Sequence, residues 1–258
     1  MKIITLNTWG GRGGKEKLLS FFQKYGPSTD VFCLQEIWSA PYDHLEGASA
    51  GGTQINNSDI MTSGMQEISN ILPDHVTFFH PHHGDHYGLL MLVKKNLNVR
   101  EEGEEFVYKY KGFVPEGDVG LHARNIQYVT LETAARPITI INFHGLWTGQ
   151  GKADTEDRLE QSKKIIRFLQ TRKNEYVLCG DFNLLPDTKS IQMIEESGLR
   201  NLIKEYQVTS TRTSYYTKPD KFADYIFTTP GLIVKSFQVL PEEVSDHAAL
   251  EVTLDLGI

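Results

Sequence analysis

Short apolar runs that are typical of strands alternate along this chain with amphipathic stretches that are typical of helices. The first unit is a strand at residues 2–7, a helix at residues 16–25 and a second strand at residues 31–35. Such alternation is the pattern of an α/β domain, in which helices cover the faces of a β-sheet. The chain has no internal repeat, low-complexity run or linker, and its 258 residues are an ordinary length for this class. We therefore predict a single domain over residues 1–258.

The rest of the chain continues this alternation. Further helices are predicted at residues 60–72 and 155–169. Further strands are predicted at residues 76–80, 89–94, 106–110, 124–132, 137–144, 176–179, 224–228, 232–240 and 249–254. The polar stretches at residues 39–58 and 111–122 are predicted to be long surface loops. The acidic run at residues 101–105 is predicted to be a solvated turn.

Several of the predicted strands end in a short burst of polar residues. These bursts are Asn7, Gln35-Glu36, Asn142-Phe143-His144 and Gly180-Asp181-Phe182-Asn183. Near the C-terminus come two more, Phe222-Ala223-Asp224-Tyr225 and Ser245-Asp246-His247. Because Asn, Asp and Gly favour turns, any one burst can be explained as the end of a strand. Their recurrence favours a functional site, since ligand sites of α/β proteins form from several loops at the strand ends.

This mixture of side chains suits the hydrolysis of a phosphoester with a divalent metal ion. Carboxylates from Glu36 and an aspartate would hold a hard cation such as Mg²⁺ or Mn²⁺, which polarises a phosphoryl oxygen. Another carboxylate or a histidine would orient and deprotonate the attacking water. The neutral amides of Asn142 and Asn183 can donate to phosphate oxygens. The chain has neither the Cys/His spacing of a zinc site nor the G-x-S-x-G motif of a serine hydrolase.

In this order along the chain, the bursts resemble the motifs of the endonuclease/exonuclease/phosphatase superfamily. That group includes abasic-site endonucleases, pancreatic-type deoxyribonucleases, neutral sphingomyelinases and inositol polyphosphate 5-phosphatases. The resemblance runs from Asn7 to His247, and it implies a four-layer α/β/β/α sandwich of two mixed β-sheets flanked by helices. One departure is that Phe222 and Ala223 stand before Asp224, where the family often has an Arg and an aliphatic residue.

The resemblance also implies a role for each polar residue. The metal ion is assigned to Glu36 as its principal ligand, with Asn7 and Asp246 close to it. Substrate binding is assigned to Asn142, Asn183 and Arg124. Catalysis is assigned to Asp181, His144, Asp224 and His247. In this scheme Asp181 positions or activates the water, and Asp224 orients the imidazole of His247.

Charge and composition narrow the substrate only in part. The net charge of −7 weakens the case for tight nonspecific binding to long nucleic acid, although a bound cation changes the local field. We rank a nuclease or DNA-repair-like phosphodiesterase first, ahead of a phospholipid or small-molecule phosphodiesterase. An inositol-phosphate-type phosphomonoesterase is a further alternative. A non-enzymatic scaffold is disfavoured, because Glu36, Asp181 and His247 are all present.

The ends and cysteines of the chain suggest a cellular location. The apolar stretch at the N-terminus is too short for a signal peptide, and no run approaches the roughly 18 apolar residues of a membrane span. Cys33 and Cys179 each lie in an apolar run and are predicted to be reduced core thiols. We therefore expect a cytoplasmic protein without a membrane span, and we expect it to be a monomer.

Three further features each allow two interpretations. Residues 80–86 read His-Pro-His-His-Gly-Asp-His and are predicted to be a polar loop at the rim of the cleft rather than a second metal site. Residues 10–15 are glycine-rich and are predicted to be a turn before the first helix rather than a phosphate-binding loop. Trp38 and Trp147 closely follow Glu36 and His144, and they are either packing residues or a stacking wall.

Overall fold

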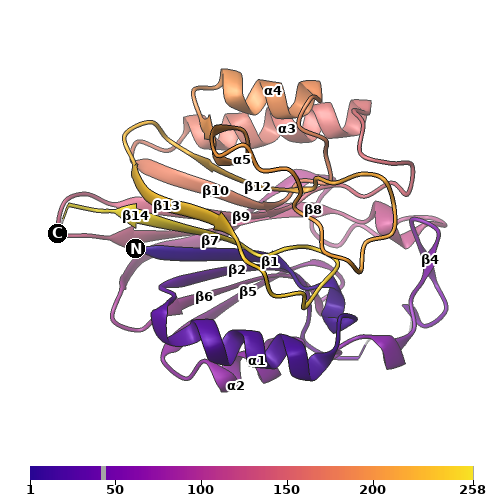
Figure 1. The fold of residues 1–258 in the computed structure, drawn as a ribbon. Helices are drawn as coiled ribbons and strands as arrows, with labels where there is room; N and C mark the ends of the chain where they lie inside the picture. The colour runs from indigo at the N-terminus through magenta and orange to yellow at the C-terminus, as the bar shows by residue number, and fades with distance from the viewer. Residues whose placement is uncertain (42–44, 258) are drawn as a thin grey trace.

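The computed structural model describes residues 1–41 and 45–257, which form two packed β-sheets with helices on their outer faces (Figure 1). Each sheet has six strands, in the orders β13-β14-β1-β2-β6-β5 and β11-β12-β10-β9-β8-β7. Both sheets are mixed, because β1 runs parallel to β2 and β9 runs parallel to β10 while other neighbours are antiparallel. The predicted four-layer α/β/β/α sandwich is confirmed.

The elements have the following bounds. The first sheet consists of β1 (Lys2–Asn7), β2 (Val31–Trp38), β5 (His75–His83), β6 (Tyr87–Lys94), β13 (Ile233–Val239) and β14 (Leu250–Asp255). The second consists of β7 (Asn98–Tyr108), β8 (Arg124–Glu132), β9 (Ile138–His144), β10 (Glu175–Asp181), β11 (Arg200–Asn201) and β12 (Asp224–Thr228). The outer helices are α1 (Lys15–Tyr25), α2 (Gly64–Ile71), α3 (Glu156–Gln170), α4 (Lys189–Glu196) and α5 (Leu202–Glu205).

Helices α1 and α2 cover the first sheet, and α3 and α4 cover the second (Figure 1). A small hairpin of β3 (Ser49–Ala50) and β4 (Thr53–Gln54) belongs to neither sheet. The short 3-10 turns are η1 (Trp9–Gly11), η2 (Gly26–Ser28), η4 (Asn57–Asp59) and η5 (Val119–Leu121). Within the part of the chain that is described, no helix is both long and apolar enough to span a membrane.

The apolar runs form strands because both faces of the sheets are covered. In β1, Ile3 packs in the cluster that joins the two sheets, whereas Ile4 packs in the cluster that contains Phe22 of α1. Successive side chains of a strand point to opposite faces, so a strand buried on both sides needs an uninterrupted apolar run. Cys33 and Cys179 lie fully buried in the core between the sheets as free thiols, as predicted.

Two segments that were predicted to be a turn and a loop belong to edge strands of the sheets. β7 includes residues 101–105, which were expected to form a turn. It is the edge strand beside β8, and its residues 98–106 are exposed or half-buried, so it tolerates a run of glutamates. β5 is the edge strand of the first sheet and continues to His83, so residues 80–83 are not a loop. Helix α4, which has eight residues, was not predicted.

The sheet order brings the polar bursts together. The parallel pairs β1–β2 and β9–β10 each end in polar residues, and the Asn7 end of β1 meets the Asp181 end of β10 across the two sheets. Within the second sheet, Asp181 is the register partner of His144 on one side and of Asp224 on the other. Residues far apart in the sequence therefore converge on one edge of the sandwich.

Candidate active site

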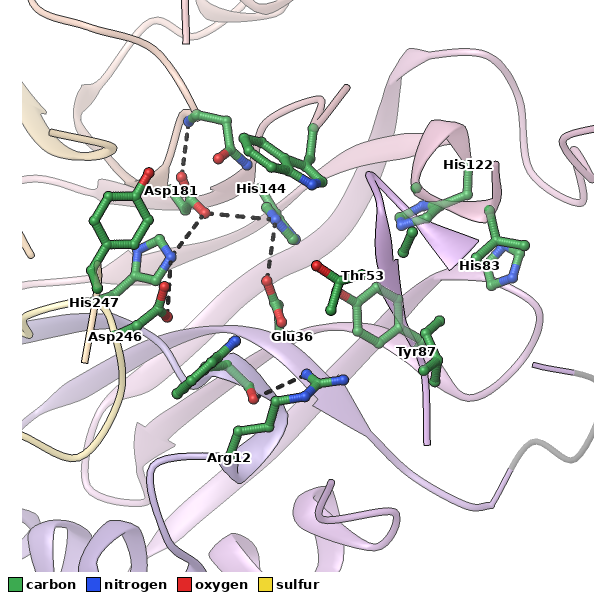
Figure 2. A pocket seen from close by; sticks show the side chains of 18 of the residues that line it. Arg12, Glu36, Thr53, His83, Tyr87, His122, His144, Asp181, Asp246 and His247 are labelled. Atoms are coloured by element: carbon green, nitrogen blue, oxygen red, sulfur yellow. Dashed lines mark hydrogen bonds and ion pairs between the residues drawn. The ribbon is translucent and has the colours of Figure 1, made fainter. Parts of the chain in front are cut away.

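A cavity of about 310 Å³ opens at this edge, and most of the predicted site residues line it. The lining includes Glu36, Arg124, His144, Asp181, Asn183, Asp246 and His247. Figure 2 shows Asp181, Asp246 and His247 on one side of Glu36, and Tyr87, His83 and His122 on the other. The structure thus joins seven of the predicted residues in one space. Asn7, Asn142 and Asp224 lie behind this surface.

A bulge in β2 directs Glu36 into the cavity. The register with β6 shifts between Leu34 and Ile37, and Glu36 itself has a φ of 58°. A bulge re-aims a side chain, and a positive φ in a residue other than glycine is a strain that surrounding packing must hold. Asn7 holds the Glu36 carboxylate in this orientation, because its Nδ2 donates to Glu36 Oε1 at 3.1 Å and to Asp181 Oδ2 at 2.9 Å.

The electrostatics of Glu36 favour a cation beside it. Burial raises the pKa of Glu36, and the opposing effects of Arg12 and of the Asn7 hydrogen bond do not cancel that rise. A carboxylate with a raised pKa lacks enough positive charge around it. A metal ion would supply that charge.

Asp181 lies between two imidazoles. Its Oδ2 is 3.7 Å from His144 Nε2 and 3.6 Å from His247 Nε2. Burial alone would raise the pKa of Asp181, but His247, Lys152 and His144 outweigh it and hold the pKa well below its usual range. Asp181 is therefore an ionised carboxylate in a buried site, able to accept hydrogen bonds from water or from protonated neighbours.

Asp224 orients His247 from behind. Its carboxylate oxygens lie 2.8 and 2.9 Å from His247 Nδ1, which leaves Nε2 facing the cavity. Burial and Arg212 lower the pKa of His247, but three carboxylates led by Asp224 outweigh them and raise it above its ordinary value. His144 differs, because burial and Arg124 lower its pKa well below the ordinary value. One imidazole is thus suited to carry a proton and the other to stay neutral.

The two carboxylate oxygens of Asp246 differ in their hydrogen bonding. Its Oδ2 accepts a hydrogen bond from Arg212 Nη1 at 2.9 Å. Its Oδ1 is buried and lies 3.7 Å from His247 Nε2, but it has no hydrogen-bond partner among the described residues. A carboxylate oxygen without a hydrogen bond suits a metal ion, since hard cations such as Mg²⁺ bind carboxylate oxygens. Arg212 was not predicted, and no local sequence signal marks it.

Another group also has metal-ligand spacing. Over the described ranges 1–41 and 45–257, one set of three His, Cys or acidic side chains has its ligand atoms within 4.8 Å of one another, and it consists of Asp181, Asp224 and His247. The hydrogen bond to Asp224 occupies Nδ1 of that imidazole, however. The geometry of this group therefore also suits a proton-handling relay.

Asn183 is held in one orientation. Its φ is 54°, and its backbone N–H donates to Asp181 Oδ1 at 2.8 Å. Its Oδ1 accepts from Lys152 Nζ at 3.1 Å, while its Nδ2 donates to the carbonyl of Gly145 at 3.3 Å. The second hydrogen of that amide is left for a ligand. Burial lowers the pKa of Lys152 to about 8. This lysine was not predicted, because its burial depends on how the loop after β9 folds.

Asn142 does not reach the cavity that the described residues form, contrary to its expected contact with the phosphate. It is fully buried between the sheets. Its Oδ1 accepts from Gln35 Nε2 at 2.7 Å, and its Nδ2 donates to the carbonyl of Leu34 at 3.0 Å and to Gln127 Oε1 at 3.2 Å. These bonds satisfy the amide, so Asn142 supports the site without facing a substrate.

Arg124 and the nearby histidines form a buried wall of the site. Arg124 lines the cavity, and its Nη2 donates to the carbonyl of Gly120 at 3.1 Å. His82 and His83 are buried, so the expectation of a polar rim loop is wrong for them. Among the described residues, the histidines at 80–86 form no group with metal-ligand spacing. Trp38, Trp147 and Arg12 all line the cavity.

This architecture and site define a class of protein. A four-layer sandwich with carboxylates, imidazoles and an amide at one edge offers groups of the kind that metal-assisted hydrolysis of a phosphoester uses. The sequence profile of the endonuclease/exonuclease/phosphatase family matches residues 4–247. The chain belongs to this family, whose members hydrolyse phosphoester bonds and typically depend on a divalent metal ion.

Solved structures show the same fold at low sequence identity. A family protein from Leptotrichia buccalis is 20% identical, with a TM-score of 0.72, and the match covers 99% of this chain and 100% of that one. A mannosyl-6-phosphatase from Bacteroides thetaiotaomicron is 15% identical, with a TM-score of 0.71 and the same coverage. The human Nocturnin catalytic domain with a bound sulfate anion is 18% identical, with a TM-score of 0.64, over 99% of this chain and 93% of that one. No curated protein matches the chain.

Proposed function

We propose that this protein is a Mg²⁺- or Mn²⁺-dependent hydrolase that cleaves a phosphoester by attack of water. The observation that carries the proposal is the ionised carboxylate of Asp181, held between His144 and His247 in the same cavity as Glu36. Glu36 and Asp246 would hold the ion, and Asn7 would keep the carboxylate of Glu36 in place. When bound, the ion would polarise the phosphoryl group and stabilise the leaving oxygen.

The other residues would bind the substrate and handle protons. Asp181 would accept a hydrogen bond from the attacking water and orient its lone pair toward phosphorus. Protonated His247, oriented by Asp224, would donate from Nε2 to a phosphate oxygen as negative charge develops. His144 would stabilise that charge, or assist the leaving group, from the opposite side of Asp181. Asn183 and Arg124 would bind the remaining phosphoryl oxygens.

Hydrolysis of bis(p-nitrophenyl) phosphate and p-nitrophenyl phosphate tests this assignment. We expect activity with Mg²⁺ or Mn²⁺, none with a chelator, and a loss of roughly a hundredfold or more in kcat for Asp181→Asn. Asp187→Asn is the matched control, because Asp187 is exposed and lies six residues further along the chain. Activity that survives both the chelator and Asp181→Asn would refute the mechanism.

The shape of the cavity favours a small phosphoester over an internal site in a nucleic-acid strand. A cavity of about 310 Å³ is the size of a small-molecule site. Beside the cavity, the β3–β4 hairpin touches the loop after β9. Gly51 of the hairpin lies so close to Trp147 that a Cβ on it would be 2.0 Å from Trp147 Nε1. A duplex crossing this edge would have to displace that contact. The fold shared with a mannosyl-6-phosphatase also supports a small phosphoester.

The sequence ranked nucleic acid first as the substrate. Beside a small phosphoester, the end of a single strand of nucleic acid is a second candidate substrate. At the cavity mouth the rings of Trp9 and Tyr215 lie 6.4 Å apart, and Lys17 donates to the Tyr215 hydroxyl at 2.7 Å. Aromatic faces beside cations can hold bases and phosphates of a single strand. Comparing kcat/KM on DNA, RNA, sphingomyelin, inositol phosphates and small esters decides between the candidates. A higher kcat/KM on oligonucleotides would favour the nuclease.

We also propose that the protein acts in the cytoplasm as a monomer. Two buried free thiols suit a reducing compartment. The exposed large apolar side chains of the described residues lie in β5 (Val76), in the loop after β7 (Tyr110 and Val114), at the end of α5 (Tyr206) and in β13 (Ile233). Light scattering of the purified protein measures the mass, and a dimer mass at micromolar concentration would contradict the monomer.

A further inference from the structure

We propose that the part of the cavity beyond Glu36 is a binding compartment for a flat, uncharged ring attached to the phosphate, and that the β3–β4 hairpin closes it. The inference rests on the proposed function, because it places the phosphoryl group between Glu36 and Asp181. In Figure 2 the compartment lies around Tyr87, Thr53 and His122, on the opposite side of Glu36 from His247.

The apolar wall of the compartment is a separate hydrophobic cluster. Trp38, Leu45 and Ile55 are buried together, with Tyr87 and Val119 packed against them. This cluster is distinct from the two clusters that form the cores of the sandwich, and all five of these residues line the cavity. Apolar side chains that face a cavity instead of filling the core provide surface for an apolar ligand group.

Ring systems make up much of this wall, which favours a flat ligand. The ring centroids of Trp38 and Tyr87 are 4.8 Å apart, and those of Tyr87 and His122 are 5.5 Å apart at an interplanar angle of 89°. His83 lies beside His122 at 5.0 Å. Edges and faces of neighbouring rings thus meet at the cavity, and a planar ring can pack against either.

The imidazoles of this wall carry little charge at neutral pH. Burial, followed by the nearby Arg124, lowers the pKa of His83 to about 4. The same two causes hold the pKa of His122 well below its ordinary value. The guanidinium of Arg124 is itself bonded to the carbonyl of Gly120 and lies next to His144. A ligand group bound here therefore needs no charge.

The hairpin closes the compartment by contacting two segments that are distant from it in the sequence. The backbone N–H of Gly51 donates to Asp118 Oδ1 at 2.8 Å and to Oδ2 at 2.9 Å. A Cβ on Gly149 would lie 2.8 Å from Gly51 Cα, so the two loops touch directly. These contacts hold the hairpin, whose Ala50 and Thr53 line the cavity, against the segments around Asp118 and Gly149.

Phosphonates test the compartment without hydrolysis, since their carbon–phosphorus bond resists attack by water. Isothermal titration calorimetry with Mg²⁺ present compares phenylphosphonate with methylphosphonate on the wild-type chain. We expect phenylphosphonate to bind roughly tenfold to a hundredfold more tightly, because the ring leaves water for an apolar wall. Equal affinity for the two would overturn the inference and leave the proposed hydrolase intact. Failure of both to bind would instead refute the assignment of the phosphate site.

Two threonines provide a matched pair of variants. Thr53 on the hairpin and Thr217, which follows Tyr216 in a separate segment of the lining, are both exposed, and both line the cavity. Thr53→Phe would fill the compartment, so we expect it to abolish the preference for phenylphosphonate while methylphosphonate still binds. Thr217→Phe adds the same ring elsewhere and should keep the preference. If Thr53→Phe kept it as well, the compartment would not lie at the hairpin.

Discussion

Replacing the buried Lys152 by methionine is expected to make the protein more stable and less active. The lysine is 2% exposed, and its Nζ lies 3.1 Å from Asn183 Oδ1 and 5.7 Å from the ring centroid of Trp147. Methionine has a similar length and no charge, so it fills the same space. The change tests whether the buried ammonium group of Lys152 lowers the stability of the fold while it keeps a positive charge beside Asp181.

The magnitude follows from the pKa of the lysine. Burial lowers that pKa from 10.5 to about 8, a difference that corresponds to about 3 kcal/mol. Because the unfolded chain binds more protons than the folded chain between these values, the free energy of unfolding rises with pH across that window. Below pH 8 the folded protein carries the full cost. Lys152→Met should therefore add about 2–3 kcal/mol at pH 7, and the gain should shrink above pH 8 and vanish above about pH 10.5.

Activity should change in the opposite direction. Without the ammonium group, the amide of Asn183 loses the donor that fixes its Oδ1. Asp181 also loses a cation that helps to keep its pKa low. We expect kcat to fall by roughly tenfold to a hundredfold, because small misplacements at a reacting centre have effects of that size.

Urea unfolding at pH 7 and pH 10 with a chelator present measures the effect on stability, and steady-state kinetics with Mg²⁺ measures the effect on activity. Lys163→Met is the matched control, because the Lys163 side chain is 51% exposed on α3 and pairs only with Glu160 among the described residues. It should leave both quantities unchanged. A Lys152→Met variant that is less stable than the wild type at pH 7 would refute the reasoning.

The remaining predictions concern the relay and the packing around the site. Asp224→Asn should lower kcat by roughly a hundredfold or more with little change in KM, because His247 loses the partner of its Nδ1; steady-state kinetics measures this. The raised pKa of His247 predicts that kcat falls as pH rises through it, and in Asp224→Asn this alkaline limb of the pH–rate profile should move to lower pH; an unchanged limb would exclude His247 as the titrating group. Asn142→Asp should destabilise the fold by about 3 kcal/mol or more in urea unfolding, because it places an unpaired charge among amides that are fully buried; a neutral result would contradict its structural role. Gly180→Ala should also destabilise strongly, since its φ is 134° and a Cβ would lie 2.0 Å from the carbonyl oxygen of Phe143; an unchanged thermal midpoint would contradict that clash.

The sequence by itself determined the α/β class, and its resemblance to a known family supplied the four-layer arrangement and the expected site residues. Strand-like runs that alternate with helical ones require a sheet covered by helices, because each apolar face must be buried. Polar bursts such as Gly180-Asp181-Phe182-Asn183 interrupt those runs where the chain leaves the sheet. Such local patterns of residue type can be recognised in the sequence alone. Glu36, Asp181 and His247 could therefore be identified before their contacts were known.

Only the tertiary structure decided what each polar residue faces. Asn142 and Asn183 are the same side chain in similar bursts, yet one is satisfied between the sheets and the other lines the cavity. Arg212 and Lys152 have no local signal and become site residues because loops fold back onto strand ends. The bond between Asn7 and Asp181 spans 174 residues of chain. Burial, and the pKa values that follow from it, depend on such distant contacts, which residue type and sequence spacing do not encode.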